Sequence, residues 1–552
     1  MTDAGHVFVV RGRLEHLDHD ATLIPTDRDF VVTPAWAAPL AAAAHGATGG
    51  SARTSARRAG TAHHTDLEDG GDDPGIDETG VGDAPATDLP GDDDAWAATV
   101  RGLRPTSWWE RGWGRAADGR PAWFVDSAAY DDPEATLGPM VDRVHAVLMD
   151  IASAGISPRS DRPRPLVALP TLGVRQGGFG DLRGTVIDRL LSVCQDVVER
   201  TGVDVVVVAA NDPDHAAFQA RRRAAGGRHA AHLTPELLDQ ARMLARRALE
   251  GSLALFLGAG VGMSAGLPSW SRLIERLAER ADADFGRLSS PLDKSELLRR
   301  RLGDDLGCMV AEEVRGTDRY GIVHALIAAF DCEQAVTTNY DDLYERAAAD
   351  AGRELAVLPW AAARPGAPWL LKMHGDVEHP ESIVLSRSDV VGYDARSRPM
   401  SAVVQALMVT KHLLVVGASM TDDNFLRLAH EVVAFQEGGP TGPAPLGTVL
   451  ALRPDPAAVE LWRGRFEHLS ASQDADGEPG DHARRLAVLL DAVAMHATPP
   501  AHLADERYAA LLPDEERPLA DAARDLRRSL DAVPGRSDSW RALERALDEI
   551  GA

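Results

Sequence analysis

A short apolar run that leads directly into a glycine-rich segment is the feature that most constrains the fold of this chain. Residues 252–257 read SLALFL, and residues 258–266 read GAGVGMSAG. An apolar run of this length is typical of a buried strand in a parallel sheet. Glycine has no Cβ, so the segment can turn tightly and adopt positive φ angles. We therefore predict a strand, a glycine turn and then a helix over residues 270–281.

The start of that predicted helix is suited to an anion. Unpaired N–H groups and the helix dipole favour negative charge there, so strand, turn and helix together predict a cradle for the diphosphate of a dinucleotide. The spacing differs from the ordinary G-x-G-x-x-G pattern, because the third glycine would fall at Met263 and Gly266 comes only later. Taken alone, the segment is equally compatible with a glycine-rich turn that binds no ligand.

Three further segments place polar residues after predicted strands. The strands are Ala335–Thr338, Trp369–Lys372 and Leu413–Val416, and a last apolar run, Thr448–Leu452, precedes Arg453. Asn339 and Asp341 follow the first strand, His374 and Gly375 the second, and Gly417, Ala418 and Ser419 the third. Open α/β sheets bind ligands at the carboxyl ends of their strands. Polar groups at these ends, beside a phosphate-type turn, indicate a nucleotide site.

Asn339, Asp341 and His374 have the chemistry that a ribose site needs. His374 can act as a general base, or as a hydrogen-bond partner of a ribose hydroxyl or water, since its ordinary pKa lies near neutral pH. Asn339 can donate and accept hydrogen bonds at ribose or a carboxamide, and Asp341 can hold a donor. A single histidine after a strand is more often structural, whereas the setting of four segments favours a functional role. Whether Asp341 or Asp342 faces the substrate stays open.

In order and spacing, the segments 258–270, 337–341, 372–376 and 416–420 resemble the sirtuin-like (silent information regulator) NAD-consuming domain. Residues from about 235 to 550 look like the sirtuin-like domains of bacterial antiphage proteins, which hydrolyse NAD to deplete the infected cell. The resemblance implies an α/β fold with a Rossmann-like parallel sheet and a helical subdomain. The match to the defence-type branch is better than to protein deacylases, on the residues Tyr340, Leu267–Trp270 and Met420–Asn424.

The resemblance also implies which residues meet NAD, the substrate whose nicotinamide–ribose bond is cleaved. Cleavage needs stabilisation of an oxocarbenium-like ribose, a positioned leaving group and a controlled acceptor. The implied catalytic cluster is His374, Asn339 and Asp341. The implied contacts with NAD are Gly258, Ala259, Gly260, Ser264, Gly266, Leu267, Trp270, Thr338, Gly417, Ser419 and Asp422.

The cysteine count separates the candidate reactions. Protein deacylases of this family share a structural zinc site made of paired cysteines, whereas this chain has only Cys194, Cys308 and Cys332 and no C-x-x-C pair. We therefore expect no zinc or other metal, which disfavours a deacylase. Three cysteines and no signal peptide lead us to expect a reduced, cytoplasmic location.

The amino-terminal third resembles a macro domain, an ADP-ribose-binding α/β module. A strand at Val7–Val10 precedes Asp20, and a strand with a glycine loop covers Pro165–Phe179. A helix over Leu182–Thr201 then leads to the apolar strand Val203–Ala209, which ends at an Asn-Asp pair. The resemblance implies an α/β macro-like domain in front of the sirtuin-like one.

Two departures from the macro pattern concern its ligand. Pro25-Thr-Asp-Arg28 replaces the asparagine-rich loop expected after Asp20, and the glycine loop carries Arg175 and Gln176. Arg175 could itself bind a phosphate. The module is therefore either a sensor for an ADP-ribose-like signal or a degenerate macro fold used for docking or assembly.

We expect two domains, residues 1–228 and residues 233–552. The first contains an insertion at about 41–94 that is poor in large apolar residues, and residues 66–94 carry acids without Lys or Arg. Such a segment buries too little apolar surface to offset its ordering entropy, which predicts disorder. Thr234-Pro235 predicts the start of a linking helix. The tail, residues 514–552, reads as two amphipathic helices, which by resemblance complete the helical subdomain over the NAD cleft.

The composition excludes some partners. A net charge of -26 argues against nucleic acid. No apolar run approaches the roughly 20 residues that span a bilayer, so we expect no membrane contact. The basic stretch Arg221–Arg223 is too short to overturn the first conclusion and is expected to cap a helix C-terminus.

Together these observations predict an NAD hydrolase effector of bacterial antiphage (antiviral, abortive-infection) defence, which releases ADP-ribose and nicotinamide. Because such an enzyme must be silent until triggered, we expect control by the macro-like module or by homo-oligomerisation. One alternative is an NAD-dependent protein deacylase or ADP-ribosyltransferase that cleaves the same bond. Another is a non-enzymatic sensor of NAD or ADP-ribose.

Overall fold

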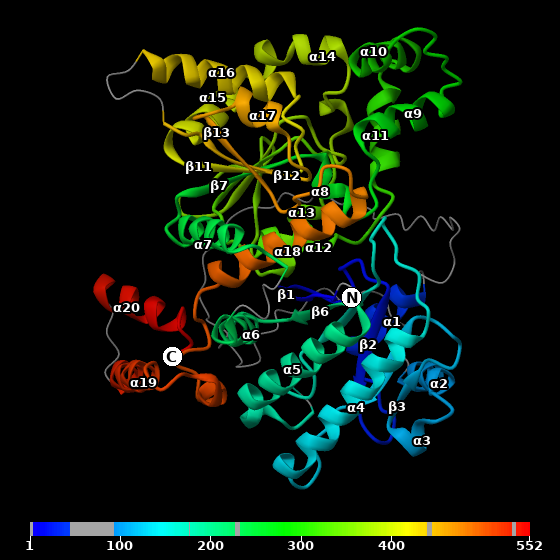
Figure 1. Cartoon of the computed structure of the whole chain (residues 1–552), viewed down its shortest axis with the longest axis vertical. Coiled ribbons are helices and arrows are strands. Elements are labelled where there is room, and N and C mark those ends of the chain that lie inside the picture. The colour runs from blue at the N-terminus through cyan, green and yellow to red at the C-terminus, as the bar shows by residue number, and fades with distance from the viewer. Residues whose placement is uncertain (1–3, 45–92, 176, 227–231, 439–443, 533–536) are drawn as a thin grey trace, which may run out of the picture.

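Two α/β units form the molecule, one below the other in Figure 1. The computed structural model describes residues 4–44, 93–175, 177–226, 232–438, 444–532 and 537–552. Most of the insertion predicted to be disordered (residues 45–92) and Gln176 lie outside the described residues. The two ends of that insertion are helical, because α1 (Ala37–Ala44) and α2 (Asp93–Leu103) include them.

The first unit is built on a six-stranded sheet in the order β1-β6-β5-β2-β4-β3. All its pairings are parallel apart from that of β3 with β4. The strands are β1 (Val7–Arg11), β2 (Ala21–Thr26), β3 (Trp113–Arg115), β4 (Ala122–Asp126), β5 (Leu166–Pro170) and β6 (Asp204–Ala209). The other helices of this unit are α3 (Trp108–Arg111), α4 (Pro133–Ser153), α5 (Arg183–Thr201) and α6 (Asp212–Ala224).

The second unit is built on a seven-stranded parallel sheet in the order β13-β12-β11-β7-β8-β10-β9. The strands are β7 (Leu253–Leu257), β8 (Gln334–Thr337), β9 (Ala356–Leu358), β10 (Trp369–Lys372), β11 (His412–Val416), β12 (Gly447–Ala451) and β13 (Phe466–Ser470). Its helices are α7 (Pro235–Leu249), α8 (Ala259–Met263), α9 (Trp270–Arg280), α10 (Pro291–Leu302), α11 (Asp305–Val314), α12 (Ile322–Ala328), α13 (Leu343–Asp350), α14 (Arg387–Val391), α15 (Tyr393–Thr410), α16 (Asp423–Glu437), α17 (Pro456–Leu461) and α18 (Pro479–Ala497).

The predicted Rossmann-like parallel sheet is confirmed. The five strands predicted here, now β7, β8, β10, β11 and β12, agree with the structure to within one residue at each end. These strands can be recognised in the sequence because parallel strands are covered on both faces and so form apolar runs. The edge strands β9 and β13 were not predicted, since β9 has three residues and β13 includes Glu467 and His468.

The helix next to the glycine turn differs from the prediction. Strand β7 leads directly into the five-residue helix α8, and the predicted helix begins at Trp270 as α9. Ser269 caps α9 by accepting a hydrogen bond from the N–H of Arg272. The linking helix is confirmed: α7 begins at Pro235, and the Thr234 side chain accepts a hydrogen bond from the N–H of Leu237.

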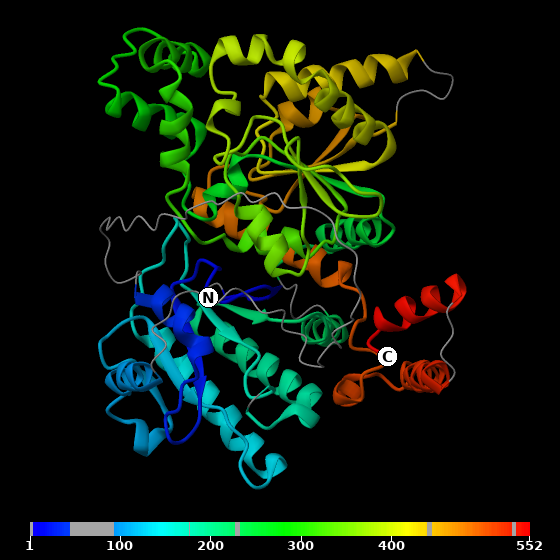
Figure 2. The ribbon, with the colours of Figure 1, turned by 180° about the vertical axis from the view of Figure 1, so that it is seen from behind.

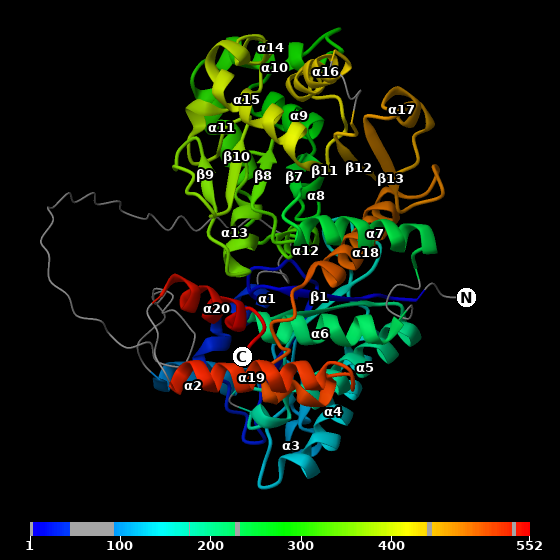
Figure 3. The same ribbon diagram turned by 90° about the vertical axis from the view of Figure 1, so that its left-hand side faces the viewer.

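Helix α18 joins the two units, and Figures 2 and 3 show it in orange between them. It packs against α7 and α12 of the second unit and against α6 and β1 of the first. One apolar core includes Phe8 of the first sheet, Leu255 of the second and Leu490 of α18. The units therefore share a core.

The carboxy-terminal tail lies away from the predicted position. Tyr508, in a 3₁₀ helix at Glu506–Leu511, packs into the core of the first unit, and its hydroxyl donates a hydrogen bond to Asp214 of α6. Figure 1 shows α19 (Arg517–Ala532) and α20 (Asp538–Asp548) beside the lower unit. The prediction that the tail completes the subdomain over the cleft is wrong, because an amphipathic pattern shows which face is buried but not which surface covers it.

Helices α9, α10 and α11 lie in that position instead. Leu273 of α9 and Val310 of α11 belong to an apolar cluster with Tyr340, Val377 and Ile383, which lie in the loops after β8 and β10. Within the described ranges, none of the helices combines the length and the apolar content that crossing a membrane requires.

Candidate functional site

A cavity of about 1140 Å³ opens at the carboxyl ends of the central strands of the second sheet. Its lining includes the loops after β7, β8, β10 and β11, and so joins all four segments singled out in the sequence. Of the predicted site residues, those in the lining are Gly258, Ala259, Gly260, Ser264, Leu267, Trp270, Thr338, Asn339, Asp341, His374, Gly417, Ser419 and Asp422. Gly266 is not among the lining residues; a Cβ at this position would be 3.3 Å from the Ser160 hydroxyl of the first unit.

The glycines of the turn allow its backbone to lie close to the loop after β11. A Cβ on Gly258 would be 2.7 Å from the Gly417 carbonyl oxygen, and one on Gly260 would be 2.9 Å from the same atom. The N–H of Gly260 donates a hydrogen bond of 2.8 Å to that carbonyl. Positive φ angles occur at Gly266 and Gly417 but not at Gly258, Gly260 or Gly262, so the expectation for the first part of the turn is wrong.

Several polar atoms of the cavity lining are buried without a hydrogen bond among the described residues, and two of them belong to the predicted catalytic cluster. Among the described residues, neither Oδ1 of Asn339 nor Nε2 of His374 has a hydrogen-bond partner. The Asn339 backbone is held by a bond from its N–H to Thr337 Oγ1, and that hydroxyl donates to the Leu257 carbonyl. A buried polar atom without a partner costs free energy, so such atoms point to a ligand or to water.

Two neighbouring aspartates point in different directions. Asp341 lines the cavity, and its Oδ2 is 3.5 Å from the position of a Cβ built on Gly262 of the glycine turn. Burial raises the pKa of Asp341, while the charge of Lys372 opposes that rise. Asp342 instead accepts a hydrogen bond of 2.8 Å from Arg346. Of the two acids left open by the sequence, Asp341 is therefore the one at the cavity.

His374 is held in a form that can accept a proton. Burial lowers its pKa, and the charge of Asp422, whose Oδ2 lies 3.4 Å from Nε2, opposes this shift. The net direction is downward, so the imidazole is neutral near pH 7. Tyr393 meets the ring edge-on, with centroids 6.2 Å apart.

The sequence-based prediction missed two features of this site. The ammonium of Lys372 joins the loops after β8 and β10, because it contacts both Asp341 and Asp376. Lys372 is one of only three lysines in the chain, and it ends a buried strand, which could have signalled a special role. The loop Ser160–Pro163 of the first unit also lines the cavity, and no local pattern signals such a contact.

Metal binding has no support in the part of the chain that the structure describes. No group of three or more His, Cys, Asp or Glu side chains there could hold a metal ion. Cys194 and Cys332 are buried free thiols, and burial raises the pKa of each to about 12. Cys308 is an exposed free thiol.

Comparison with known proteins agrees with this geometry. Residues 333–466 match the SIR2-like domain family, so the second unit carries a SIR2-like domain. The chain is 29% identical over 192 residues to the NAD(+) hydrolase ThsA of Bacillus cereus (strain MSX-D12), covering 32% of this chain and 39% of that protein. It is 27% identical over 196 residues to the NAD(+) hydrolase ThsA of Enterococcus faecium, covering 33% and 40%.

A third relative is the Defense-associated sirtuin 2 of Bacillus subtilis. It is 25% identical over 221 residues, which cover 38% of this chain and 21% of that protein. The matches thus span about two fifths or less of each relative's length.

Proposed function

We propose that this protein is an NAD hydrolase of bacterial antiphage defence. The observation that carries the proposal is the position of Asn339 Oδ1 and His374 Nε2, two buried atoms without a hydrogen bond among the described residues, in one large cavity beside a glycine turn. A ribose and a water molecule supply the hydrogen bonds that these atoms lack. The names of the relatives, two NAD(+) hydrolases and a defence-associated sirtuin, support the same reaction and setting.

In the proposed reaction the bond between nicotinamide and ribose C1′ breaks, and its electron pair leaves with nicotinamide and neutralises the pyridinium charge. Water adds to C1′ and gives up a proton, which the neutral His374 accepts. Asn339 orients the ribose or the water, and the negative charge of Asp341, when ionised, favours an oxocarbenium-like ribose. NAD and water become ADP-ribose, nicotinamide and a proton.

The test is nicotinamide release by the purified full chain. The proposal predicts equal amounts of nicotinamide and ADP-ribose from NAD alone. Release that depends on an acetyl-lysine peptide would contradict it in favour of a deacylase. Calorimetric binding of NAD with no turnover, under every condition that alters oligomeric state, would contradict it in favour of a sensor.

The pH dependence follows from the environment of His374. Burial holds its pKa below 6.5, so the acid limb of kcat/KM should lie below pH 6.5. Asp422→Asn removes the charge that opposes this shift and should move the limb to still lower pH. Asparagine also suits the N-cap position that Asp422 occupies on α16, so the fold should be preserved. Profiles of both proteins check this; a limb that moves to higher pH in the variant would contradict it.

The first unit is proposed to regulate the cleft, because it forms part of the wall. Ser160, Asp161 and Arg162 line the same cavity as the glycine turn. This loop is fixed within its own unit: Arg162 donates hydrogen bonds to Asp18 at 2.7 Å and to Asp20 at 2.8 Å. It also touches α18, since a Cβ on Gly480 would be 2.6 Å from the Asp161 carbonyl oxygen.

A trigger that shifts the first unit would thus change the NAD cleft directly. An ADP-ribose-like ligand of this macro-like unit, and assembly into a homo-oligomer, are the two triggers we propose. Addition of ADP-ribose to the full chain, with nicotinamide release and molecular mass measured together, separates them.

A substitution at Asp161 tests whether the first unit forms part of the NAD site. It lies in the left-handed region (φ 55°), which asparagine tolerates, so Asp161→Asn removes a charge with little strain. The carboxylate repels the diphosphate of NAD, and we expect the KM for NAD to fall about two- to fivefold at low salt with kcat unchanged. Asp131→Asn, an exposed acid of the same unit outside the lining, is the matched control. Equal KM values for all three proteins would argue against the first unit as part of the site.

A further inference from the structure

The side chain of Lys372 is fully buried at the end of β10. Its ammonium donates to the backbone carbonyls of Asp341 (2.7 Å) and Tyr340 (3.2 Å). It also contacts the carboxylates of Glu345 at 2.9 Å and Asp376 at 2.7 Å. Four acceptors thus share three N–H donors, and the ammonium is enclosed by oxygen atoms.

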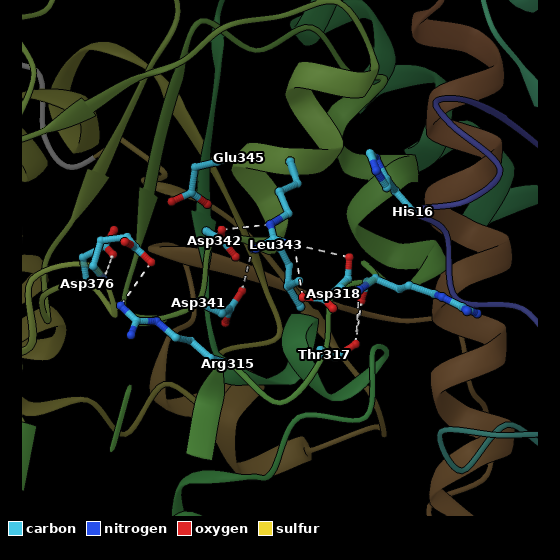
Figure 4. A network of polar contacts seen from close by, with 12 residues as sticks. His16, Arg315, Thr317, Asp318, Asp341, Asp342, Leu343, Glu345 and Asp376 are labelled. Carbon is cyan, nitrogen blue, oxygen red and sulfur yellow. Dashed lines mark hydrogen bonds and ion pairs between the residues drawn. The ribbon is translucent and has the colours of Figure 1, made fainter. Parts of the chain in front are cut away.

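These contacts join the two loops that carry the proposed catalytic groups. Tyr340 and Asp341 directly follow Asn339 in the loop after β8, whereas Asp376 lies two residues beyond His374 in the loop after β10. Figure 4 shows Asp341, Glu345 and Asp376 within one network of polar contacts. Gly375, between His374 and Asp376, has a φ of 94°, so the second loop bends sharply here.

Lys372 is the cation of a cluster whose other charged groups are acids. Burial alone would lower the pKa of Lys372, but Glu345 and Asp376 overcome that effect and raise it, so the ammonium stays charged. Burial raises the pKa of Glu345 to about 7, although Lys372 opposes the rise. One cation therefore serves three acids, Asp341, Glu345 and Asp376, and its removal leaves them without a cationic contact among the residues that the structure describes.

We propose that Lys372 is a positioning residue, whose ammonium fixes Asn339 and His374 relative to one another and thereby sets kcat. The inference rests on the proposed NAD hydrolysis. Lys372 does not line the cavity, so it acts through the two loops and not on the substrate. A displacement of about 1 Å in a reacting constellation can cost roughly 100-fold in rate.

The test compares three variants with the full-length wild type. Lys372→Met keeps the length of the side chain and removes the charge, and kcat should fall about 100-fold with KM changed less than threefold. The double variant Lys372→Met/Glu345→Gln removes one acid along with the cation, so its thermal stability should recover. Lys411→Met is the control and should keep its rate, because the Lys411 ammonium donates a hydrogen bond to the Gly251 carbonyl and lies outside the cavity lining.

The double variant separates positioning from a merely structural role. Recovery of stability without recovery of kcat supports positioning, because the bonds to the Tyr340 and Asp341 carbonyls are still absent. Recovery of both together overturns it.

Hydrogen–deuterium exchange gives a readout that does not need turnover. Peptides that cover residues 338–345 and 373–378 should exchange faster in Lys372→Met, while α18 peptides stay as in the wild type. Unchanged exchange in both loops overturns the inference, even where the wild type cleaves no NAD. If the wild type cleaves no NAD but both loops exchange faster in Lys372→Met, the result contradicts the proposed function and leaves the role of Lys372 in holding the loops supported.

Discussion

Replacement of His374 by alanine is expected to lower the rate of NAD cleavage by about 100- to 10,000-fold, the range that a general base contributes. The imidazole lines the cavity and its Nε2 makes no hydrogen bond among the described residues, so its loss removes chemistry and little structure. The measurement is nicotinamide release at saturating NAD, with circular dichroism and melting temperature recorded on the same protein.

His430→Ala is the matched control for that result. His430 lies on α16, stacked on Trp462 with centroids 5.2 Å apart, and outside the cavity lining. It should retain the wild-type rate. A His374→Ala protein that cleaves NAD within about threefold of the wild type would overturn the assignment of the base.

Asp491→Asn is expected to have the largest effect on stability, about 3–5 kcal/mol less free energy of unfolding. Asp491 of α18 and Arg222 of α6 are both fully buried and joined by two hydrogen bonds, one of 3.0 Å to Oδ1. His6, which directly precedes β1, contacts Oδ2 at 2.7 Å. Without the carboxylate, the buried Arg222 charge loses the anion with which it pairs among the described residues. Urea denaturation of both proteins measures the difference.

The same pair gives a pH signature. Burial would raise the pKa of Asp491, but the charge of Arg222 and the hydrogen bond from His6 hold it at about 2, below the usual 3.8. This contribution to stability is therefore complete above pH 3.8 and is lost as the pH falls towards 2. Asp491→Asn should remove that part of the acid sensitivity.

Asp525→Asn, in an exposed pair with Arg528 on α19, is the control and should change stability by less than about 1 kcal/mol. Equal stability of Asp491→Asn and wild type would show that the buried pair does not hold the units together.

The parts of the structure that could be predicted are those with a local signal. The apolar strands β7, β8, β10 and β11 and the polar residues after them were readable, because a parallel sheet brings such strand ends to one edge. This placed Asn339, Asp341 and His374 at one cavity before any geometry was known.

The remainder depends on contacts between distant residues. Asp491 and His6 are 485 residues apart, and Lys372 meets Asp341 across 31 residues, so no periodicity reports either contact. The three arginines at the end of α6 were expected to cap the helix, yet Arg222 is buried against Asp491. Amphipathic α19 likewise has a buried face, but its partner surface is set by the fold.

The central claim, hydrolysis at ribose C1′ in the cavity of Asn339 and His374, is tested most directly in water enriched with ¹⁸O. NAD is incubated with the purified full chain, and the masses of the products are measured by mass spectrometry and compared with those from His374→Ala. The account predicts that the wild type forms nicotinamide and ADP-ribose with one ¹⁸O atom, and that the variant forms almost none. Intact NAD with the wild type under every condition, or nicotinamide release without labelled ADP-ribose, would contradict it.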